Sequence, residues 1–201
     1  MLARLLRSVV RRHTDMRRNQ FDVLPLPDGR VLFLGDSITE AGNWNEWFPS
    51  YRILNRGIGG DTVEGVRGRL GTAVNRPAAI SLLVGTNDLH RQARVAGIAA
   101  QFAELVYQIR TLAPDSPLIV NSVMPRGRQW ASRIHELNQR YAATARDADA
   151  GYVDLWPALA DGDALRAAYT RDGIHLNGHG YQAWVDVLRP RLEAVLGAES
   201  C

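Results

Sequence analysis

The chain has 201 residues, a hydrophobic fraction of 46% and a charged fraction of 22%, which predict one soluble globular domain with a core of its own. No apolar run reaches the roughly 18 residues that a membrane-spanning helix needs, so we expect no stable insertion into a membrane. The one cysteine, Cys201, excludes an intrachain disulfide and a structural zinc site built on thiolates.

Positive charge is concentrated at the N-terminus. Residues 1–18 contain six arginines and one aspartate and carry +5, so the remainder of the chain carries −2 of the total charge of +3. Arginines interrupt the apolar residues of this segment too often for a secretory signal, which predicts a cytoplasmic protein. We therefore divide the chain into a basic N-terminal arm over residues 1–20 and a single domain over residues 21–201.

A basic arm of this kind has several interpretations. Such an arm can bind nucleic acid, an anionic membrane surface or a partner subunit. We favour a solvated basic helix that packs on the domain. No nucleic-acid partner is therefore expected.

Five short apolar segments recur along the chain and predict buried parallel strands. They are rich in Val, Ile and Leu and are bounded by Gly, Pro or Asn. In chain order they are 30–35, 51–58, 79–85, 117–123 and 151–156.

Longer segments between and after these strands predict helices. In 95–113 the apolar residues fall three or four positions apart, which is typical of an amphipathic helix packed on a sheet. The segments 131–148 and 180–196 follow the same pattern, and Pro190 is expected to kink or restart the last helix. A weaker helix is predicted over 61–74. Strands that alternate with helices indicate an α/β fold, with a five-stranded parallel sheet covered on both faces.

Four polar, glycine-containing loops carry the residues that are candidates for a role in catalysis. The first strand leads into Gly35-Asp36-Ser37, the second into NRGIGGDT over 55–62, and the third into GTND over 85–88. The fourth loop, RDGIHLN over 171–177, precedes the last helix. Because active sites of parallel sheets gather at the carboxyl ends of the strands, we expect these loops to converge there.

Together these loops contain the groups that a serine hydrolase needs. A serine hydroxyl requires an adjacent base at neutral pH, and His175 is the candidate base for Ser37. Asp172 lies three residues before His175 and is expected to orient the imidazole and stabilise its charged form. Candidate donors to an oxyanion are the main-chain N–H groups of Ser37 and Gly60 and the side-chain amide of Asn87.

Each of these residues also has a structural interpretation. Ser37 has the capping-box spacing to Glu40, so it is a candidate helix cap as well as a nucleophile. Asp61 is a candidate N-cap, and Asn87 fits a turn or a cap. The functional interpretation is favoured because a nucleophile, a base, an orienting carboxylate and an oxyanion amide occur together at predicted strand ends.

The four loops resemble the sequence blocks of the SGNH (GDSL-type) hydrolases. GDSI matches the first block, with Ile38 in place of the usual leucine, and NRGIGGDT, GTND and DGIH match the other three in order. The resemblance implies a flavodoxin-like three-layer α/β/α fold and the hydrolysis of esters or thioesters without a metal or other cofactor. It also implies the roles given above: Ser37, Asp172 and His175 as catalytic residues, and Ser37, Gly60 and Asn87 as the oxyanion hole.

Within this family, GDSITEAGNWNEWF followed by NRGIGGDT is similar to the platelet-activating-factor acetylhydrolase-like and carbohydrate O-acetylesterase branch. This similarity implies removal of short acyl groups, acetyl foremost, from a small-molecule ester such as an O-acetylated sugar. A thioesterase or a lipase with broad acyl tolerance is the alternative within the same chemistry. A non-catalytic binding module on the same scaffold is the alternative from another class. The oligomeric state stays open, and a homo-oligomer is compatible with the sequence.

Three further features have two interpretations each. Trp44 is our candidate for the wall of a substrate pocket, although such an aromatic residue also packs in a core. Arg126 and Arg128 follow the fourth strand at the expected site edge, but a solvated loop is favoured. His175 and His179 have the spacing of paired metal ligands on a helix, but the glycines on either side of His179 argue against a shared helix, and no metal is expected.

Overall fold

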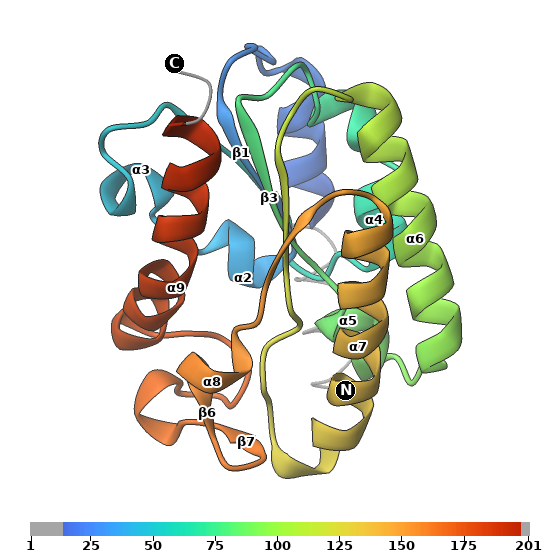
Figure 1. Ribbon diagram of the computed structural model, residues 1–201, viewed down its shortest axis with the longest axis vertical. Helices are drawn as coiled ribbons and strands as arrows, with labels where there is room; N and C mark the ends of the chain where they lie inside the picture. Colours follow the sequence, from blue (N-terminus) through green and yellow to red (C-terminus); the bar gives the residue numbers. More distant parts are fainter. Residues whose placement is uncertain (1–13, 198–201) are drawn as a thin grey trace.

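A sheet of five parallel strands forms the centre of the protein, and helices cover both of its faces (Figure 1). The computed structural model describes residues 14–197. The strands lie in the order β2-β1-β3-β4-β5, and neighbouring strands pair in parallel. Each lies inside one of the five apolar segments, so the predicted three-layer fold is confirmed. Their bounds are Val31–Gly35 (β1), Ile53–Gly57 (β2), Ala79–Leu83 (β3), Leu118–Asn121 (β4) and Gly151–Val153 (β5).

The three long helices that the sequence predicted are present. They are α6 (Val95–Leu112), α7 (Ala131–Asp147) and α9 (Gly178–Gly197). Shorter helices are α2 (Ser37–Glu40), α3 (Trp44–Trp47), α4 (Val63–Arg67), α5 (Thr86–His90) and α8 (Trp156–Leu159). Single turns of 3-10 helix occur at η1 (Leu70–Thr72), η2 (Arg128–Trp130) and η3 (Ala167–Tyr169). Among residues 14–197, no helix has the length and apolar character to cross a membrane.

Successive residues of each strand pack into two separate cores. Leu32 and Leu34 of β1 lie with the buried side chains of α4, α6 and α7 on one face of the sheet. Val31 and Phe33 lie with those of α3, α8 and α9 on the other face. Burial on both faces explains why the strands appear in the sequence as continuous apolar runs and not as alternating ones.

Pro190 lies inside α9, which continues through it as one helix. A proline removes a backbone donor and disfavours a helix interior. Leu188 and Leu192 on either side of it are fully buried in the same core, however, and this packing holds both halves of the helix on the sheet. The expected restart of the helix is therefore wrong.

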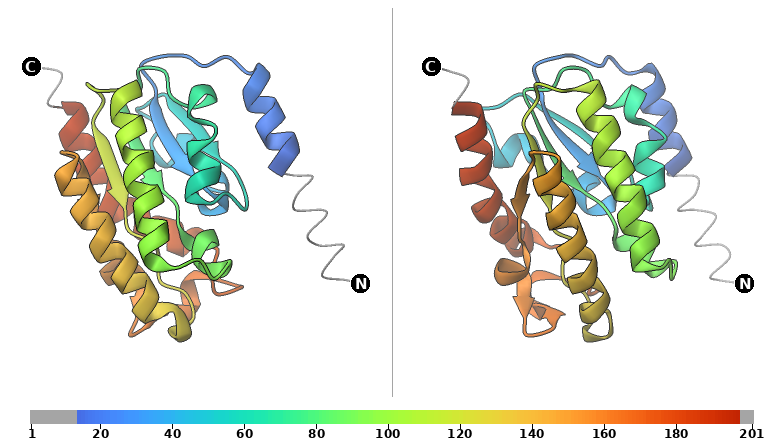
Figure 2. Two further views of the ribbon diagram at one scale, coloured as in Figure 1. Left: turned by 90° about the vertical axis from the view of Figure 1, so that its right-hand side faces the viewer. Right: turned by 45° about the vertical axis from the view of Figure 1, so that its right-hand side comes forward.

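The described residues of the basic arm, 14–20, lie in a helix over 14–23, which packs at the β2 edge of the sheet (Figure 2). Phe21 is buried in this contact. The guanidinium groups of Arg17 and of Arg56 from β2 lie 4.8 and 4.3 Å from the centroid of its ring. The rest of the arm, residues 1–13, lies outside the described residues, and the boundary at residue 20 stays a prediction.

A small antiparallel pair of strands was not expected from the sequence. It consists of β6 (Ala160–Asp161) and β7 (Ala164–Leu165). The Leu165 N–H donates to the carbonyl of Arg126 at 2.8 Å, so the pair lies against the loop that follows β4. Strands of two residues are too short to produce a periodic sequence pattern.

Candidate active site

The first polar loop places Ser37 at the junction of β1 and α2. The strand ends at Gly35, and the helix begins at Ser37 itself. Asp36 caps this helix, because its Oδ1 accepts a hydrogen bond from the Ile38 N–H at 3.0 Å. The interpretation of Ser37 as the cap is therefore wrong, and its hydroxyl is left for another partner.

Ser37 and His175 are hydrogen-bond neighbours although 138 residues separate them in the sequence. The Ser37 Oγ lies 2.9 Å from the His175 Nε2. The other ring nitrogen, Nδ1, lies 2.6 Å from the Oδ2 of Asp172. The expected serine, histidine and aspartate thus form one hydrogen-bonded chain, with the hydroxyl within reach of proton transfer to the imidazole.

The fourth loop holds Asp172 against His175. The Asp172 Oδ1 accepts hydrogen bonds from the N–H groups of Ile174 and His175 at 2.9 and 2.8 Å. Gly173 has a φ of +76°, a left-handed conformation that glycine adopts at little cost in this tight turn. Desolvation opposes ionisation of Asp172, but the hydrogen bonds from His175 and Ile174 outweigh it and hold the pKa of Asp172 well below its ordinary value. The carboxylate is therefore charged at neutral pH.

The second and third loops meet at Gly60 and Asn87. The Asn87 side-chain amide donates to the carbonyl of Asp61 at 2.9 Å. Gly59 lies beside Ser37, since a β-carbon built on Gly59 would stand 3.8 Å from that of Ser37. Within residues 14–197, the main-chain N–H groups of Ser37 and Gly60 have no hydrogen-bond acceptor. Such groups are available to an oxygen atom of a ligand.

Asp61 is not the N-cap that the sequence suggested. Thr62 caps α4, because its hydroxyl accepts a main-chain N–H of the first turn at 3.2 Å. The Asp61 carboxylate is buried instead and pairs with Arg18 and Arg69, the latter at 2.6 Å. Arg69 also donates to the carbonyl of Gly35 at 2.9 Å. This cluster ties the second loop to the first.

Trp44 does not line a pocket, which corrects the expectation drawn from its position near Ser37. The side chain is 1% exposed and lies flat on Phe33, with ring centroids 4.1 Å apart. Its indole Nε1 donates to the carbonyl of Thr39 at 2.8 Å, and its ring meets that of Trp184 edge-on. Trp44 therefore packs α3 and α9 onto the sheet, where substrate does not reach it.

The two arginines that follow β4 differ in environment. Arg128 is exposed, as a solvated loop requires. Arg126 is buried, donates to the carbonyl of Thr86 at 3.3 Å and stacks on the ring of Trp130. The solvated-loop interpretation is therefore wrong for Arg126.

The two histidines with metal-ligand spacing do not share a helix. Since α9 begins at Gly178, His179 lies on the helix and His175 lies before it. Over the described range 14–197, no group of three or more His, Cys, Asp or Glu side chains is arranged to hold a metal ion.

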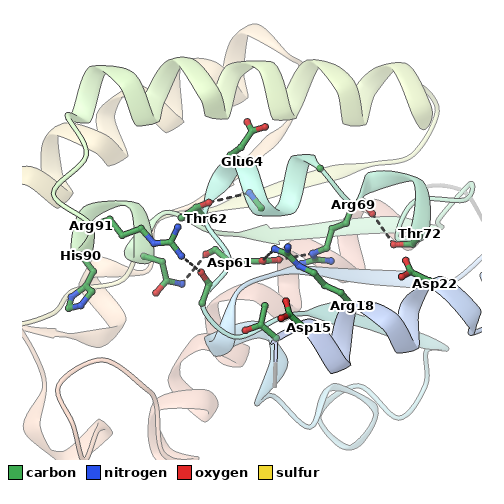
Figure 3. Close-up of a pocket in the computed structure, with 15 residues that line it drawn as sticks. Asp15, Arg18, Asp22, Asp61, Thr62, Glu64, Arg69, Thr72, His90 and Arg91 are labelled. Carbon is green, nitrogen blue, oxygen red and sulfur yellow. Dashed lines mark hydrogen bonds and ion pairs between the residues drawn. The ribbon is translucent and has the colours of Figure 1, made fainter. Parts of the chain in front are cut away.

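A cavity of about 1380 Å³ opens beside Gly60 and Asn87 (Figure 3). Helix 14–23, segment 60–72 and α5 contribute to its walls. Apolar and charged groups both line it, and Ser37, Asp172 and His175 are not among its lining residues. Its charged side chains have both signs: Asp15, Arg18, Asp22, Asp61, Glu64, Arg69 and Arg91.

The fold, together with these four loops at one edge of the sheet, defines an acylhydrolase of the SGNH type. The sequence profile of the GDSL-like Lipase/Acylhydrolase family matches residues 33–183, and the chain belongs to this family. The alpha2 subunit of platelet-activating factor acetylhydrolase IB from Homo sapiens is 32% identical over an alignment of 169 residues that covers 75% of this chain and 70% of that protein. The alpha1 subunit from Mus musculus is 30% identical over an alignment of 165 residues that covers 75% of this chain and 69% of that protein.

Solved structures show the same fold. A chain from Streptococcus pneumonia, whose description names platelet activating factor, has a TM-score of 0.86 at 25% identity and covers 96% of this chain and 98% of its own. An acetyl xylan esterase from Geobacillus stearothermophilus has a TM-score of 0.66 at 19% identity, with coverages of 86% and 96%. The similarity to the acetyl xylan esterase shows a shared fold only.

Proposed function

We propose that the chain is a serine esterase that removes short acyl groups, acetyl foremost, through an acyl-enzyme on Ser37. One observation carries the proposal: Ser37 Oγ lies 2.9 Å from His175 Nε2, and His175 Nδ1 lies 2.6 Å from Asp172. The family gives the reaction class, acyl hydrolysis. The three side chains supply a nucleophile, a base and an orienting carboxylate within reach of one another.

In the first half of the proposed reaction, Ser37 Oγ attacks the ester carbonyl carbon while His175 Nε2 takes the hydroxyl proton. Asp172 accepts the hydrogen bond from Nδ1 and stabilises the imidazolium that forms. The bond to the alcohol oxygen then breaks, and His175 gives its proton to the departing alcohol. Water attacks the acyl-serine by the same route, and release of the acid restores Ser37.

The tetrahedral intermediates carry negative charge on the former carbonyl oxygen. We assign its stabilisation to the N–H groups of Ser37 and Gly60 and to the amide of Asn87. The two main-chain groups have no acceptor within residues 14–197, which supports this assignment. An amide nitrogen carries two donors, and Asn87 uses one of them on the carbonyl of Asp61, so the other is left for the substrate.

For the alcohol part of the substrate we propose a hydroxyl-rich group such as a sugar. The charged lining of the cavity beside Gly60 and Asn87 supports this proposal. An acetylated lipid is the second candidate, because the relatives at 30 and 32% identity are subunits of platelet-activating factor acetylhydrolase IB. A thioesterase or a lipase with broad acyl tolerance is the alternative within the same chemistry.

A series of 4-nitrophenyl esters from acetate to decanoate tests the acyl preference. We expect kcat/KM to fall steeply once the chain is longer than a few carbons. A flat or rising series would favour the broad-chain lipase. A matched pair of an acetyl ester and an acetyl thioester separates esterase from thioesterase. Faster turnover of the thioester would contradict our proposal.

A second experiment tests the alcohol. Acetate release is measured from O-acetylated sugars and from an ether phospholipid with a 2-acetyl group. Faster release from the sugars supports the proposal, and faster release from the phospholipid favours the lipid candidate. Labelling of Ser37 by a fluorophosphonate excludes a non-catalytic binding module, whereas an unlabelled folded protein would favour it.

A further inference from the structure

Helix 14–23 lies outside the part of the chain that matches the family, residues 33–183, and it contacts the loop that carries Gly60. We propose that this helix positions the segment Gly59-Gly60-Asp61, so that Thr14 and Arg18 are positioning residues for the oxyanion hole. The inference rests on the proposed function, because it assigns these residues an effect on the charge that develops during ester hydrolysis.

The first contact is made by Thr14. Its hydroxyl donates to the carbonyl of Gly59 at 2.7 Å, across 45 positions of sequence. That carbonyl belongs to the same peptide unit as the Gly60 N–H. A peptide unit is planar, so a partner that fixes the carbonyl also fixes the direction of the N–H on the opposite side. Thr14 therefore orients a proposed oxyanion donor without touching the substrate.

This peptide unit needs such a partner because glycine lies on both sides of it. Gly60 has a φ of +81°, and glycine rotates between backbone regions at little cost. The preceding N–H, that of Gly59, donates to the Glu40 carboxylate at 2.7 Å. Arg17 of the helix pairs with the same Glu40 at 3.5 Å. The N–H and the carbonyl of Gly59 are thus both held, directly or through one side chain, by helix 14–23.

The second direct contact is the ion pair of Arg18 with Asp61. Figure 3 shows the guanidinium groups of Arg18 and Arg69 both directed at the Asp61 carboxylate. The carboxylate is fully buried, so removal of one cation leaves part of its charge without a partner. Since the carbonyl of Asp61 accepts the Asn87 amide, movement of Asp61 also disturbs a second proposed donor.

The central test is Thr14→Val, which removes the hydroxyl and keeps the branched shape. We expect kcat for 4-nitrophenyl acetate to fall about tenfold, less than the 10²–10³ that loss of a whole donor typically costs, while KM changes by less than about twofold. Thr14→Ser keeps the hydroxyl and should restore most of kcat. Arg18→Met is the second variant and should lower kcat in the same direction. Exposed Asn19 on the same helix gives the control, Asn19→Ala, which should match the wild type.

The outcomes separate this inference from the proposed function. A wild type that hydrolyses the ester while Thr14→Val keeps the full kcat would overturn the inference alone. Two other results would assign helix 14–23 a role in stability only and would overturn the inference too. One is a loss of kcat in Thr14→Val that is equally large in Thr14→Ser. The other is a loss of kcat in Thr14→Val that accompanies a drop in melting temperature also seen in Asn19→Ala. A Ser37→Ala variant that is as active as the wild type would refute the proposed function itself.

Discussion

The side-chain amide of Asn87 donates to the main-chain carbonyl of Asp61 at 2.9 Å, and this bond joins two loops that follow different strands. Asp88, the next residue, accepts the N–H of Val63 on both carboxylate oxygens, at 3.3 and 3.1 Å. The third loop is thus hydrogen-bonded both to the second loop and to the first residue of α4, which follows it. The amide of Asn87 is oriented before any substrate arrives, which is the condition for effective stabilisation of an oxyanion.

Replacement of Asn87 by alanine is expected to lower kcat for 4-nitrophenyl acetate by about 10²–10³, with little change in KM, because the lost donor acts on the transition state. The rate of ester hydrolysis at saturating substrate measures this. Asn75 provides a matched control, since its amide also donates to a main-chain carbonyl, that of Leu26 at 2.7 Å, and lies on the surface. Equal losses in Asn87→Ala and Asn75→Ala would argue against the role of Asn87.

Replacement of Asp172 by asparagine is expected to reduce kcat by a factor on the order of 10²–10⁴, because an amide neither stabilises the imidazolium nor secures the tautomer of His175. The control is Asp154→Asn. Asp154 is also an exposed aspartate that accepts a local main-chain hydrogen bond, from the Trp156 N–H at 3.0 Å. An Asp172→Asn enzyme that retains more than about a third of the wild-type kcat would remove Asp172 from the mechanism.

The buried carboxyl of Asp36 predicts a loss of stability as the pH rises. Burial raises its pKa from 3.8 to about 7, although the hydrogen bond from Ile38 and the charge of His175 oppose the shift. The folded protein therefore holds this proton more tightly than the unfolded chain, and stability falls between about pH 4 and 7 and is constant above that range. Burial raises the pKa of Asp88 to about 6 and acts in the same direction.

Asp36→Asn keeps an oxygen for the Ile38 N–H but has no proton to lose. Melting temperatures measured from pH 4 to 8 should therefore decline less in this variant than in the wild type. Asp28→Asn, at an exposed aspartate paired with Arg76, should leave the wild-type slope unchanged. Parallel slopes for the wild type and Asp36→Asn would show that Asp36 is ionised throughout this range.

Replacement of Trp44 by alanine is expected to lower the free energy of unfolding by about 3–5 kcal/mol, because a fully buried aromatic side chain is removed from the core. Trp47→Ala, at a half-buried site three residues later, should cost less. Chemical denaturation measures both values. If Trp44→Phe raised KM for 4-nitrophenyl acetate without loss of stability, Trp44 would be a pocket residue after all.

The strands and the serine–histidine–aspartate group could be predicted because each has a local signal. Strands buried on both faces appear as Val, Ile and Leu runs, and the four loops follow one another with motifs of their own. That Ser37 and His175 would meet was predicted from the four motifs taken together, because the loop of His175 precedes α9 and follows no strand of the parallel sheet. For residues 14–20, the described part of the basic arm, the favoured packed helix is confirmed.

The remaining features depend on contacts between residues far apart in the chain. Thr14 reaches Gly59 across 45 positions and Arg18 reaches Asp61 across 43, and neither pair has a local pattern. Position near Ser37 in the sequence suggested a pocket role for Trp44, but the pleat directs its stacking partner, Phe33, into the core shared with α9. The cytoplasmic location stays a prediction.

The most direct test of the central claim is the hydrolysis of 4-nitrophenyl acetate by Ser37→Ala, with Ser50→Ala, at an exposed serine, as the matched control. We predict that Ser37→Ala loses at least about a thousandfold in kcat and is not labelled by a fluorophosphonate, while Ser50→Ala behaves as the wild type. A folded Ser37→Ala protein whose turnover stays within about tenfold of the wild type would contradict the assignment of Ser37 as the nucleophile.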